Sequence, residues 1–296
     1  MAAGDGAIAA FDLDVGTDEL YAAFGPDGAR LLTGGRTVQI WETETGRCVR
    51  TLDGHRGPVT ALCWAPGGQE VASGGFDDHL VRVWDVASGA ALRTFPGHTG
   101  YIRAVASSPS GRLLLSGSGD GTVRVWEWSS GACLRVLEGH TDGVYHAVFD
   151  PGERRVLSGG RDGSLRLWDL ASGRSECLLR GAPYRVQHLA WSADERHFLT
   201  CSRDIRLCDA AQRRCVRSFA GHGDTIRSVQ WSSDERRILS GAHDGTVRVW
   251  DAATGQCLRV LEGQGQCVVA AAWGRGDGRI LSCDSSGGLR VWRWTE

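Results

Sequence analysis

The chain has 296 residues, enough for one large domain or two of ordinary size, and 42% of them are hydrophobic. Its 33 basic and 35 acidic residues give a net charge of −2, which excludes a strong overall field for recruiting nucleic acid or a membrane surface. All the basic side chains are arginine, so enzymes that depend on a Schiff-base lysine or a phosphate-loop lysine are excluded.

The main feature of the sequence is a pattern that recurs every 40 to 43 residues. One landmark is a tryptophan, replaced once by cysteine. It occurs at Trp41, Trp84, Trp126, Trp168, Cys208, Trp250 and Trp292. A second landmark is the pair Gly-His, which occurs at Gly54-His55, Gly97-His98, Gly139-His140 and Gly221-His222. Seven such units account for almost the whole chain.

Each unit contains signals for four short strands, as the sixth copy shows. Residues 226–231 alternate apolar and polar side chains, and three further short apolar runs follow at 237–240, 246–250 and 257–261. Gly, Asp and Ser fill the turns between them, and no stretch has helical periodicity. The sequence therefore predicts one four-stranded antiparallel sheet per unit.

The Gly-His and Trp-Asp landmarks, at a spacing of about 40 residues, resemble those of the WD-repeat (WD40) family. The resemblance extends over residues 7–296 and implies an all-β fold, a single seven-bladed β-propeller with four antiparallel strands per blade. In this family an N-terminal strand closes the ring. We therefore expect residues 7–14 to complete the last blade, which otherwise lacks its fourth strand, and residues 1–6 to form a short tail. A closed ring has no edge strand that demands a neighbour, so we expect a monomer.

Histidine, serine and aspartate recur at fixed spacing and look like a hydrolase triad. A triad needs one nucleophile beside one pocket, whereas this set occurs in four copies. The resemblance instead implies a buried hydrogen-bond chain that links the strands of a blade through the landmark tryptophan. The predicted network residues are His55, Ser73, Asp77 and Trp84; His98, Ser116, Asp120 and Trp126; His140, Ser158, Asp162 and Trp168; and His222, Ser240, Asp244 and Trp250. We expect no catalytic residues, no cofactor and no metal, and hence no enzyme.

Blades one, five and seven depart from this pattern. Blade five has Ala182 and Cys208 in place of the histidine and the tryptophan, and blade seven has Gln264 and Ser286 in place of the histidine and the aspartate. Blade one has a short hairpin at residues 35–37. We expect these three blades to be the softer ones.

The placement of the ten cysteines argues against a disulfide framework. Cys48, Cys133, Cys215 and Cys257 occupy one repeat position in different blades, too far apart to bridge one another. No C-x-x-C spacing for zinc or redox chemistry is present. We therefore expect free thiols, as in a reducing compartment. With no apolar run of about 18 residues and no secretory leader, we expect a cytoplasmic protein without a membrane segment.

Positions that vary between blades are the ones that can confer specificity. The resemblance implies that partners contact the face formed by the loop before the first strand and the hairpin between the second and third strands. The predicted partner-binding residues are Tyr21, Phe76, Tyr101, Arg103, Tyr145, Arg161, Arg185, Arg203, Arg227 and His243. Tyrosine and arginine are enriched at binding hot spots, and clustered guanidinium groups favour carboxylates and phosphates. The expected partner is a protein or peptide, acidic or phosphorylated.

The leading interpretation is a protein-interaction scaffold that binds partners at the mouth of the central channel. The alternative is a sensor or target-recognition module that acts in trans with a separate kinase, NTPase or protease. An enzyme is disfavoured because the candidate catalytic groups are all repeated. A nucleic-acid binder is disfavoured because the net charge is close to zero.

Overall fold

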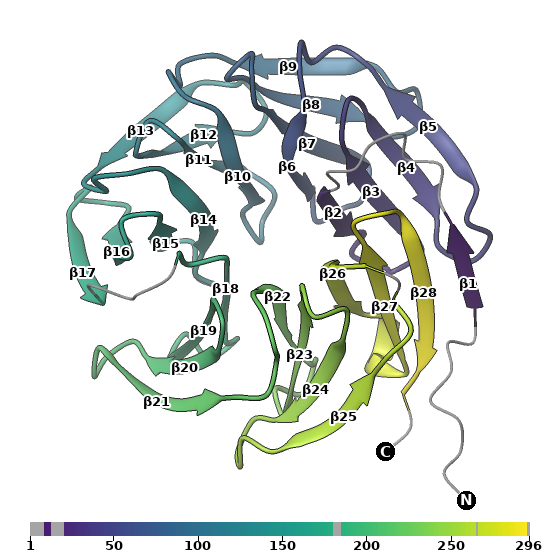
Figure 1. The fold of residues 1–296 in the computed structure, drawn as a ribbon. Coiled ribbons are helices and arrows are strands. Elements are labelled where there is room, and N and C mark those ends of the chain that lie inside the picture. The colour runs from purple at the N-terminus through teal and green to yellow at the C-terminus, as the bar shows by residue number, and fades with distance from the viewer. Residues whose placement is uncertain (1–8, 13–20, 180–184, 265, 295–296) are drawn as a thin grey trace, which may run out of the picture.

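The computed structural model describes residues 9–12, 21–179, 185–264 and 266–294, and of residues 9–12 and 275 it describes the backbone alone. The predicted tail at 1–6, Ala182, and residues 7–8 and 13–14 of the predicted closing strand lie outside the described residues. The strands form seven four-stranded sheets arranged around a central axis (Figure 1). The predicted all-β, seven-bladed propeller is confirmed. Apart from the strands, the described residues contain one short 3-10 turn, η1 (Arg275–Asp277), and no helix there is long and apolar enough to cross a membrane.

Within each blade the first strand lies nearest the axis and the fourth forms the outer rim (Figure 1). Blades one and two comprise β2 (Tyr21–Phe24), β3 (Arg30–Gly34), β4 (Val38–Glu42), β5 (Cys48–Leu52), β6 (Val59–Trp64), β7 (Glu70–Gly75), β8 (Val81–Asp85) and β9 (Ala91–Phe95). Blades three and four comprise β10 (Ile102–Ser107), β11 (Leu113–Ser118), β12 (Thr122–Glu127), β13 (Cys133–Glu138), β14 (Val144–Phe149), β15 (Arg155–Gly160), β16 (Leu165–Asp169) and β17 (Ser175–Leu179). Blades five and six comprise β18 (His188–Trp191), β19 (His197–Cys201), β20 (Ile205–Asp209), β21 (Arg214–Phe219), β22 (Ile226–Trp231), β23 (Arg237–Ala242), β24 (Val247–Asp251) and β25 (Cys257–Leu261). Blade seven comprises β26 (Val268–Trp273), β27 (Arg279–Asp284), β28 (Gly288–Arg293) and β1 (Ala9–Asp12).

Blade seven joins the two ends of the chain. Its outer strand β1 runs antiparallel to β28, with Ala9 opposite Val291 and Asp12 opposite Gly288. The predicted closure of the ring by the N-terminal strand is therefore confirmed. Because β1 covers the edge of β28, the backbone groups along that edge are paired instead of open to solvent or to another chain.

The second strand of each blade controls how closely the next blade packs. The second strands are almost entirely buried, whereas an outer strand such as β13 is mostly exposed. A Cβ atom placed on Gly159 would lie 2.4 Å from Cγ1 of Val186 in the next blade, and one on Gly74 would lie 2.4 Å from Cγ2 of Ile102. A larger residue at either contact would force the neighbouring blade to shift, so in these two blades the glycine that follows the network serine permits the close spacing.

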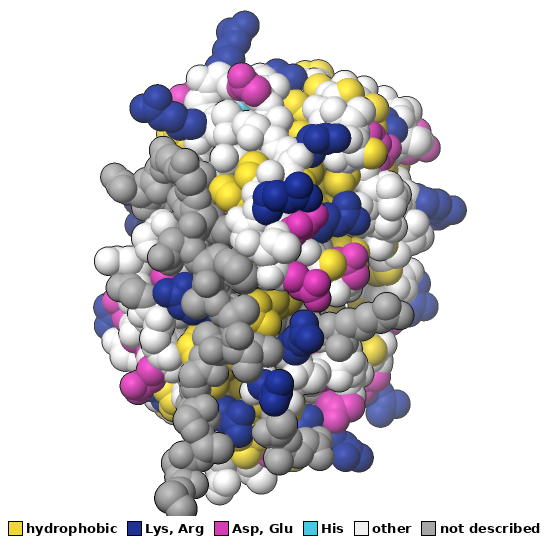
Figure 2. All heavy atoms as spheres, turned by 90° about the vertical axis from the view of Figure 1, so that its right-hand side faces the viewer, with side chains coloured by type: hydrophobic (Ala, Val, Ile, Leu, Met, Phe, Trp, Pro, Cys, Tyr) yellow, Lys and Arg dark blue, Asp and Glu magenta, His cyan; other side chains and the backbone are white. Residues whose placement is uncertain are grey.

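Arginines on the outer strands tie neighbouring blades together. Arg50 in blade one donates to the backbone carbonyl of Ala87 in blade two. In the same way, Arg135 in blade three donates to the equivalent carbonyl of Ala171 in blade four. Figure 2 shows the side of the ring near β1, where arginine and acidic side chains are interspersed. Arg50 and Arg135 therefore link neighbouring blades.

The histidine–serine–tryptophan network is clearest in blade four. Trp168 Nε1 donates to Ser158 Oγ at 2.7 Å, and Ser158 Oγ lies 2.8 Å from His140 Nε2. On its other side the imidazole ring bonds Asp162, with Nδ1 3.1 Å from Oδ2. Burial lowers the pKa of His140, against the opposing effect of Asp162, so the ring is kept neutral and accepts the serine proton. Ser158 is 0% exposed, and its hydroxyl bonds both the tryptophan and the histidine.

Blades three and six contain the same contacts at the predicted residues, whereas blade two differs from the prediction at one position. His55 Nδ1 bonds Asp78 at 2.9 Å, so Asp78 and not Asp77 completes this network. The hairpin of blade two has one extra residue. Counting forward from Ser73 therefore selects the wrong aspartate, while counting back six residues from Trp84, as in the other blades, selects Asp78.

Blade seven contains a variant of the network that the sequence analysis did not recognise. Trp292 Nε1 donates to Ser282 Oγ at 2.7 Å, and the Gln264 amide accepts from the same serine. The amide nitrogen faces Asp284 Oδ2 at 3.1 Å. Asp284 also accepts from Ser286, the residue expected at the aspartate position. An amide and a displaced carboxylate thus replace the imidazole and the usual aspartate.

In blade five a disulfide forms at the position of the landmark tryptophan, which corrects the prediction that every thiol is free. Cys208, at the tryptophan landmark, is bonded to Cys215. The two residues lie opposite each other on β20 and β21. Equivalent cysteines of different blades are far apart, but the third and fourth strands of one blade bring Cys208 and Cys215 together. The other eight cysteines are free.

Candidate functional site

The side chains that line the central channel project from irregularities at the start of the inner strands. In blades three, four and six the pairing with the second strand shifts by one residue at Arg103, Tyr145 and Arg227. A β-bulge leaves its extra residue outside the ladder and redirects that side chain. All three side chains line cavities in the channel. The bulges therefore place two arginines and a tyrosine from three different blades in one space.

Five of the predicted residues form a continuous arginine–tyrosine chain across the mouth, in the order Arg227, Tyr21, Arg103, Tyr145, Arg185. The Arg103 guanidinium lies between two rings, 4.8 Å from the centre of Tyr21 and 5.2 Å from that of Tyr145, and donates to the Tyr21 hydroxyl. Arg227 lies 5.7 Å from the Tyr21 ring, and Arg185 donates to the Tyr145 hydroxyl at 3.1 Å. Ring faces attract guanidinium groups without neutralising their charge. The chain therefore holds three positive charges in place and leaves them able to attract an anion.

A wide cavity of about 590 Å³ opens above this chain in blades three to six. Its lining includes Arg161, Arg203 and His243 together with the three arginines of the chain. Arg161 lies 3.6 Å from Asp142, and both side chains are about half exposed. Burial and then the charge of Arg227 lower the pKa of His243. Seven of the ten predicted partner-binding residues thus line one basic cavity: Arg103, Tyr145, Arg161, Arg185, Arg203, Arg227 and His243.

Phe76 and Tyr101 lie outside this cavity and form a separate aromatic platform between blades two and three. Their rings stack with centres 5.0 Å apart and planes tilted by 16°. Phe76 is 43% exposed, and Tyr101 lies so close over Gly119 that a Cβ atom there would meet its ring at 2.5 Å. The platform therefore offers a fixed, partly exposed aromatic surface on the predicted contact face.

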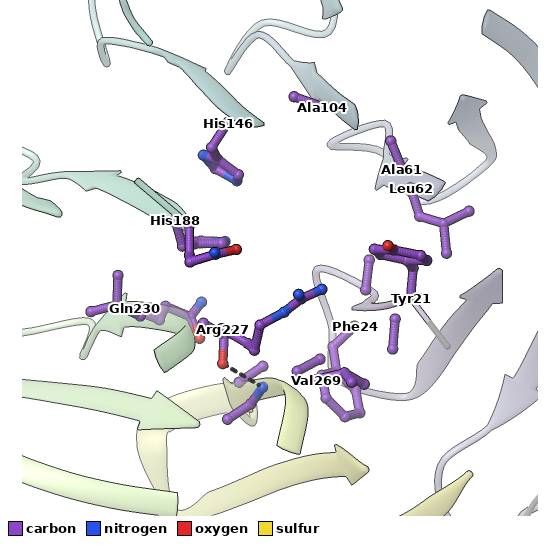
Figure 3. A pocket seen from close by; sticks show the side chains of 18 of the residues that line it. Tyr21, Phe24, Ala61, Leu62, Ala104, His146, His188, Arg227, Gln230 and Val269 are labelled. Atoms are coloured by element: carbon purple, nitrogen blue, oxygen red, sulfur yellow. Dashed lines mark hydrogen bonds between the residues drawn. The ribbon is translucent and has the colours of Figure 1, made fainter. Parts of the chain in front are cut away.

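A second cavity of about 350 Å³ lies deeper in the channel (Figure 3). Arg227 projects into it opposite Tyr21, while His146 and His188 project from the neighbouring blades. The two imidazole rings are 4.1 Å apart and tilted by 38°. Small side chains such as Ala61 and Ala104 form much of the remaining wall.

Sequence reasoning missed His146 and His188, although a signal was present. By strand pairing they occupy one repeat position, because His146 lies opposite Gly159 and His188 opposite Cys201. Blades two and three have alanine at that position, and blade one has Tyr21, opposite Gly34. A large polar residue at a position that is alanine in some blades indicates a channel-lining group, as it does for His146 and His188.

Burial lowers the pKa of both histidines. His146 is shifted well below its ordinary value by burial and then by His188, and the pKa of His188 falls to about 4 through burial and then the charge of Arg227. The Nδ1 atom of each ring is buried without a hydrogen-bond partner among the described residues. The pKa of the Arg227 guanidinium is also lowered, by burial and then by Arg103. The deep cavity is thus positively charged, and it contains buried ring nitrogens without hydrogen-bond partners among the described residues.

The repeats of this chain match those of known proteins. The sequence profile of the WD domain, G-beta repeat (WD40), matches residues 46–85, 89–127, 131–169, 213–251 and 255–293, more than half of the chain. A stretch of 46 residues, 15% of this chain, is 46% identical to Periodic tryptophan protein 2 homolog of Dictyostelium discoideum and covers 5% of that protein. A stretch of 55 residues, 18% of this chain, is 36% identical to an uncharacterized WD repeat-containing protein of Synechocystis and covers 16% of it. The matches thus span a small part of each relative. The profile matches, together with the seven four-stranded blades, show that the chain belongs to the WD40 family.

Proposed function

We propose that this propeller is a protein-interaction scaffold that holds an acidic or phosphorylated segment of a partner protein at the mouth of its channel. The observation that carries the proposal is the basic cavity above the arginine–tyrosine chain. Its described lining contains five arginines and two aspartates, Asp142 and Asp162. Asp162 already accepts from His140 and Ser164, so it offers little compensation to the arginines.

The geometry favours an extended segment of a partner over a broad, flat interface. Guanidinium groups bind carboxylates and phosphates through paired hydrogen bonds, and the rings on either side of Arg103 restrict its orientation before a partner arrives. The Phe76–Tyr101 platform lies beside the basic cavity, where it can accept an apolar side chain of the same segment. WD40 propellers typically bind proteins or peptides, which agrees with this arrangement.

We further propose that the protein acts without catalysis, as a monomeric ring in the cytoplasm. The repeated serines are buried behind tryptophans and cannot serve as nucleophiles. Within the described residues no cluster of three or more His, Cys, Asp or Glu side chains could hold a metal ion. The closed ring supports the monomeric state. Eight of the ten cysteines are free, which agrees with a reducing compartment, whereas the Cys208–Cys215 disulfide does not.

Fluorescence anisotropy with three versions of one peptide tests the proposed function. The versions carry phosphoserine, glutamate or glutamine at the same central positions. We expect binding in the order phosphoserine, glutamate, glutamine, and a loss of about tenfold or more in the double variant Arg161→Gln/Arg185→Gln. The matched control, Arg47→Gln/Arg214→Gln, removes the same charge from the outer surface and should leave affinity unchanged. Equal affinity for all three peptides, or equal loss in both variants, would contradict the proposal.

A further inference from the structure

We propose that the deep cavity is an oxyanion subsite whose occupancy is coupled to protonation of His146 and His188. The subsite takes one phosphate-like or carboxylate group beneath the arginine–tyrosine chain. This inference extends the proposed function by naming what the channel holds below its mouth and what regulates it.

The charge of the deep cavity supports an anionic occupant. Its described lining contains two guanidinium groups and two imidazole rings, and no aspartate or glutamate. Arg227 and Arg103 both approach Tyr21, so their positive ends converge on one side of the cavity. The buried Arg227 guanidinium and the half-buried Arg103 guanidinium repel each other without a facing carboxylate, and a bound anion would relieve that repulsion.

The histidine pair couples anion binding to proton binding. The rings are in contact, and each has a buried Nδ1 without a partner among the described residues. Two adjacent imidazolium ions in a basic cavity would repel each other and the nearby guanidinium, so the empty site favours two neutral rings. A bound oxyanion reverses this preference, because it attracts the added protons and accepts hydrogen bonds from the rings.

The groups that surround the pair are mostly cationic or neutral. They are Arg103 on β10, Tyr145 on β14, Cys201 on β19, Arg227 on β22 and Tyr21 across the channel on β2. Burial raises the pKa of the Cys201 thiol to about 12, so it stays uncharged. Asp204 lies beyond Cys201 and is paired with Arg206, with Nε and Oδ2 3.0 Å apart. No described carboxylate of the lining therefore competes with an incoming anion.

Linkage fixes the direction of the pH dependence. The pKa of His188 is about 4 in the empty site, and a bound anion moves it up towards or above the ordinary value of about 6.5. Between these two values the occupied site binds more protons than the empty one. Anion affinity therefore rises as the pH falls from about 7 towards about 4, and it changes little above pH 7.

Sulfate is the appropriate probe because it remains a dianion across this range, whereas phosphate itself titrates. We expect sulfate to bind wild-type protein about tenfold more tightly at pH 5 than at pH 7. Calorimetry in two buffers of different ionisation enthalpy should register proton uptake, and the imidazole NMR resonances of His146 and His188 should titrate at higher pH in sulfate than in chloride. The last two measurements use the wild-type protein, so they do not depend on a variant that folds.

Variants identify the groups involved. His146→Gln/His188→Gln should bind sulfate with no pH dependence, and Arg227→Gln should lose about tenfold in affinity at both pH values. Arg214→Gln, on the outer strand β21, is the control and should behave as wild type. Sulfate binding that is equally tight at pH 5 and pH 7, or that keeps its pH dependence without the two histidines, would overturn the proposal, as would no binding at all.

Competition between sulfate and the phosphoserine peptide separates two sources of the anionic group, a side chain of the partner and a free anion. It also keeps the subsite and the proposed function distinguishable. If the phosphoserine peptide competes with sulfate, the group is a side chain of the partner; if both bind together, it is a free anion. Peptide capture without sulfate-linked proton uptake would refute the subsite and leave the proposed function intact. Proton-coupled sulfate binding without peptide capture would refute the proposed function and support the subsite.

Discussion

Replacement of Asp78 by alanine should destabilise the protein, whereas the same change at Asp77 should have almost no effect. The Asp78 side chain is 4% exposed, and its carboxylate accepts from His55 Nδ1 at 2.9 Å and from the Leu80 backbone N–H at 3.2 Å. Asp77 is exposed to solvent on the same hairpin. The two aspartates therefore form a matched pair with the same chemistry and adjacent positions.

The magnitude follows from the donors left without an acceptor. Each buried donor that loses its partner costs about 1–3 kcal/mol, so Asp78→Ala should cost about 3 kcal/mol in unfolding free energy. For a chain of this size that corresponds to a decrease of about 5 °C in melting temperature. Asp77→Ala should change the unfolding free energy by less than about 0.5 kcal/mol.

Urea unfolding followed by tryptophan fluorescence measures both variants, because Trp84 belongs to the affected network. Calorimetry provides the melting temperatures. Equal destabilisation by the two substitutions, or a larger effect at Asp77, would show that the hairpin of blade two is assigned in the wrong register.

Three further predictions concern the ring as a whole. Deletion of residues 1–14 removes the partner of β28 and should lower the melting temperature and promote aggregation by light scattering; an unchanged profile would refute closure by β1. Gly159→Ala should cost about 1–3 kcal/mol by calorimetry because its Cβ meets the next blade, whereas Gly278→Ala, with nothing within 4 Å, should be neutral; similar costs would contradict the spacing argument. Burial opposes ionisation of Asp162 and Asp244, but hydrogen bonds from hydroxyl and backbone N–H groups outweigh it and lower both pKa values to about 2. Their stabilisation is present above the ordinary aspartate pKa and is lost as the pH falls towards 2, so the acid limb of a urea-midpoint titration should flatten in Asp162→Asn/Asp244→Asn.

The repeat made most of the fold predictable. Tryptophan and glycine-histidine landmarks recur because every blade packs in the same way. The N-terminal apolar segment was the one strand left to complete the last blade. Asp78 and the Cys208–Cys215 disulfide were each missed for a local reason. The disulfide depends on how two strands face each other within one blade, which a comparison between blades does not reveal. Asp78 was missed because the spacing was counted from Ser73 across a hairpin with one extra residue.

The candidate site was predictable in composition and not in geometry. The varied positions identified Arg103, Tyr145 and Arg227 from the sequence, but the bulges and the curvature of the ring determine that Arg103 reaches Tyr21 from two blades away. The contact between His146 and His188 depends likewise on the packing of β14 against β18 in neighbouring blades. No spacing along the chain encodes these distances.

The central claim is that the arginines of the channel mouth bind an acidic or phosphorylated segment of a partner. Its most direct test is the affinity of the phosphoserine peptide for wild-type protein, for Arg103→Gln/Arg185→Gln/Arg227→Gln, and for the control Arg47→Gln/Arg214→Gln/Arg293→Gln, with the melting temperature of each variant measured in parallel. The account predicts a loss of about a hundredfold or more in the first variant and wild-type affinity in the control. Equal affinity in all three folded proteins would contradict it.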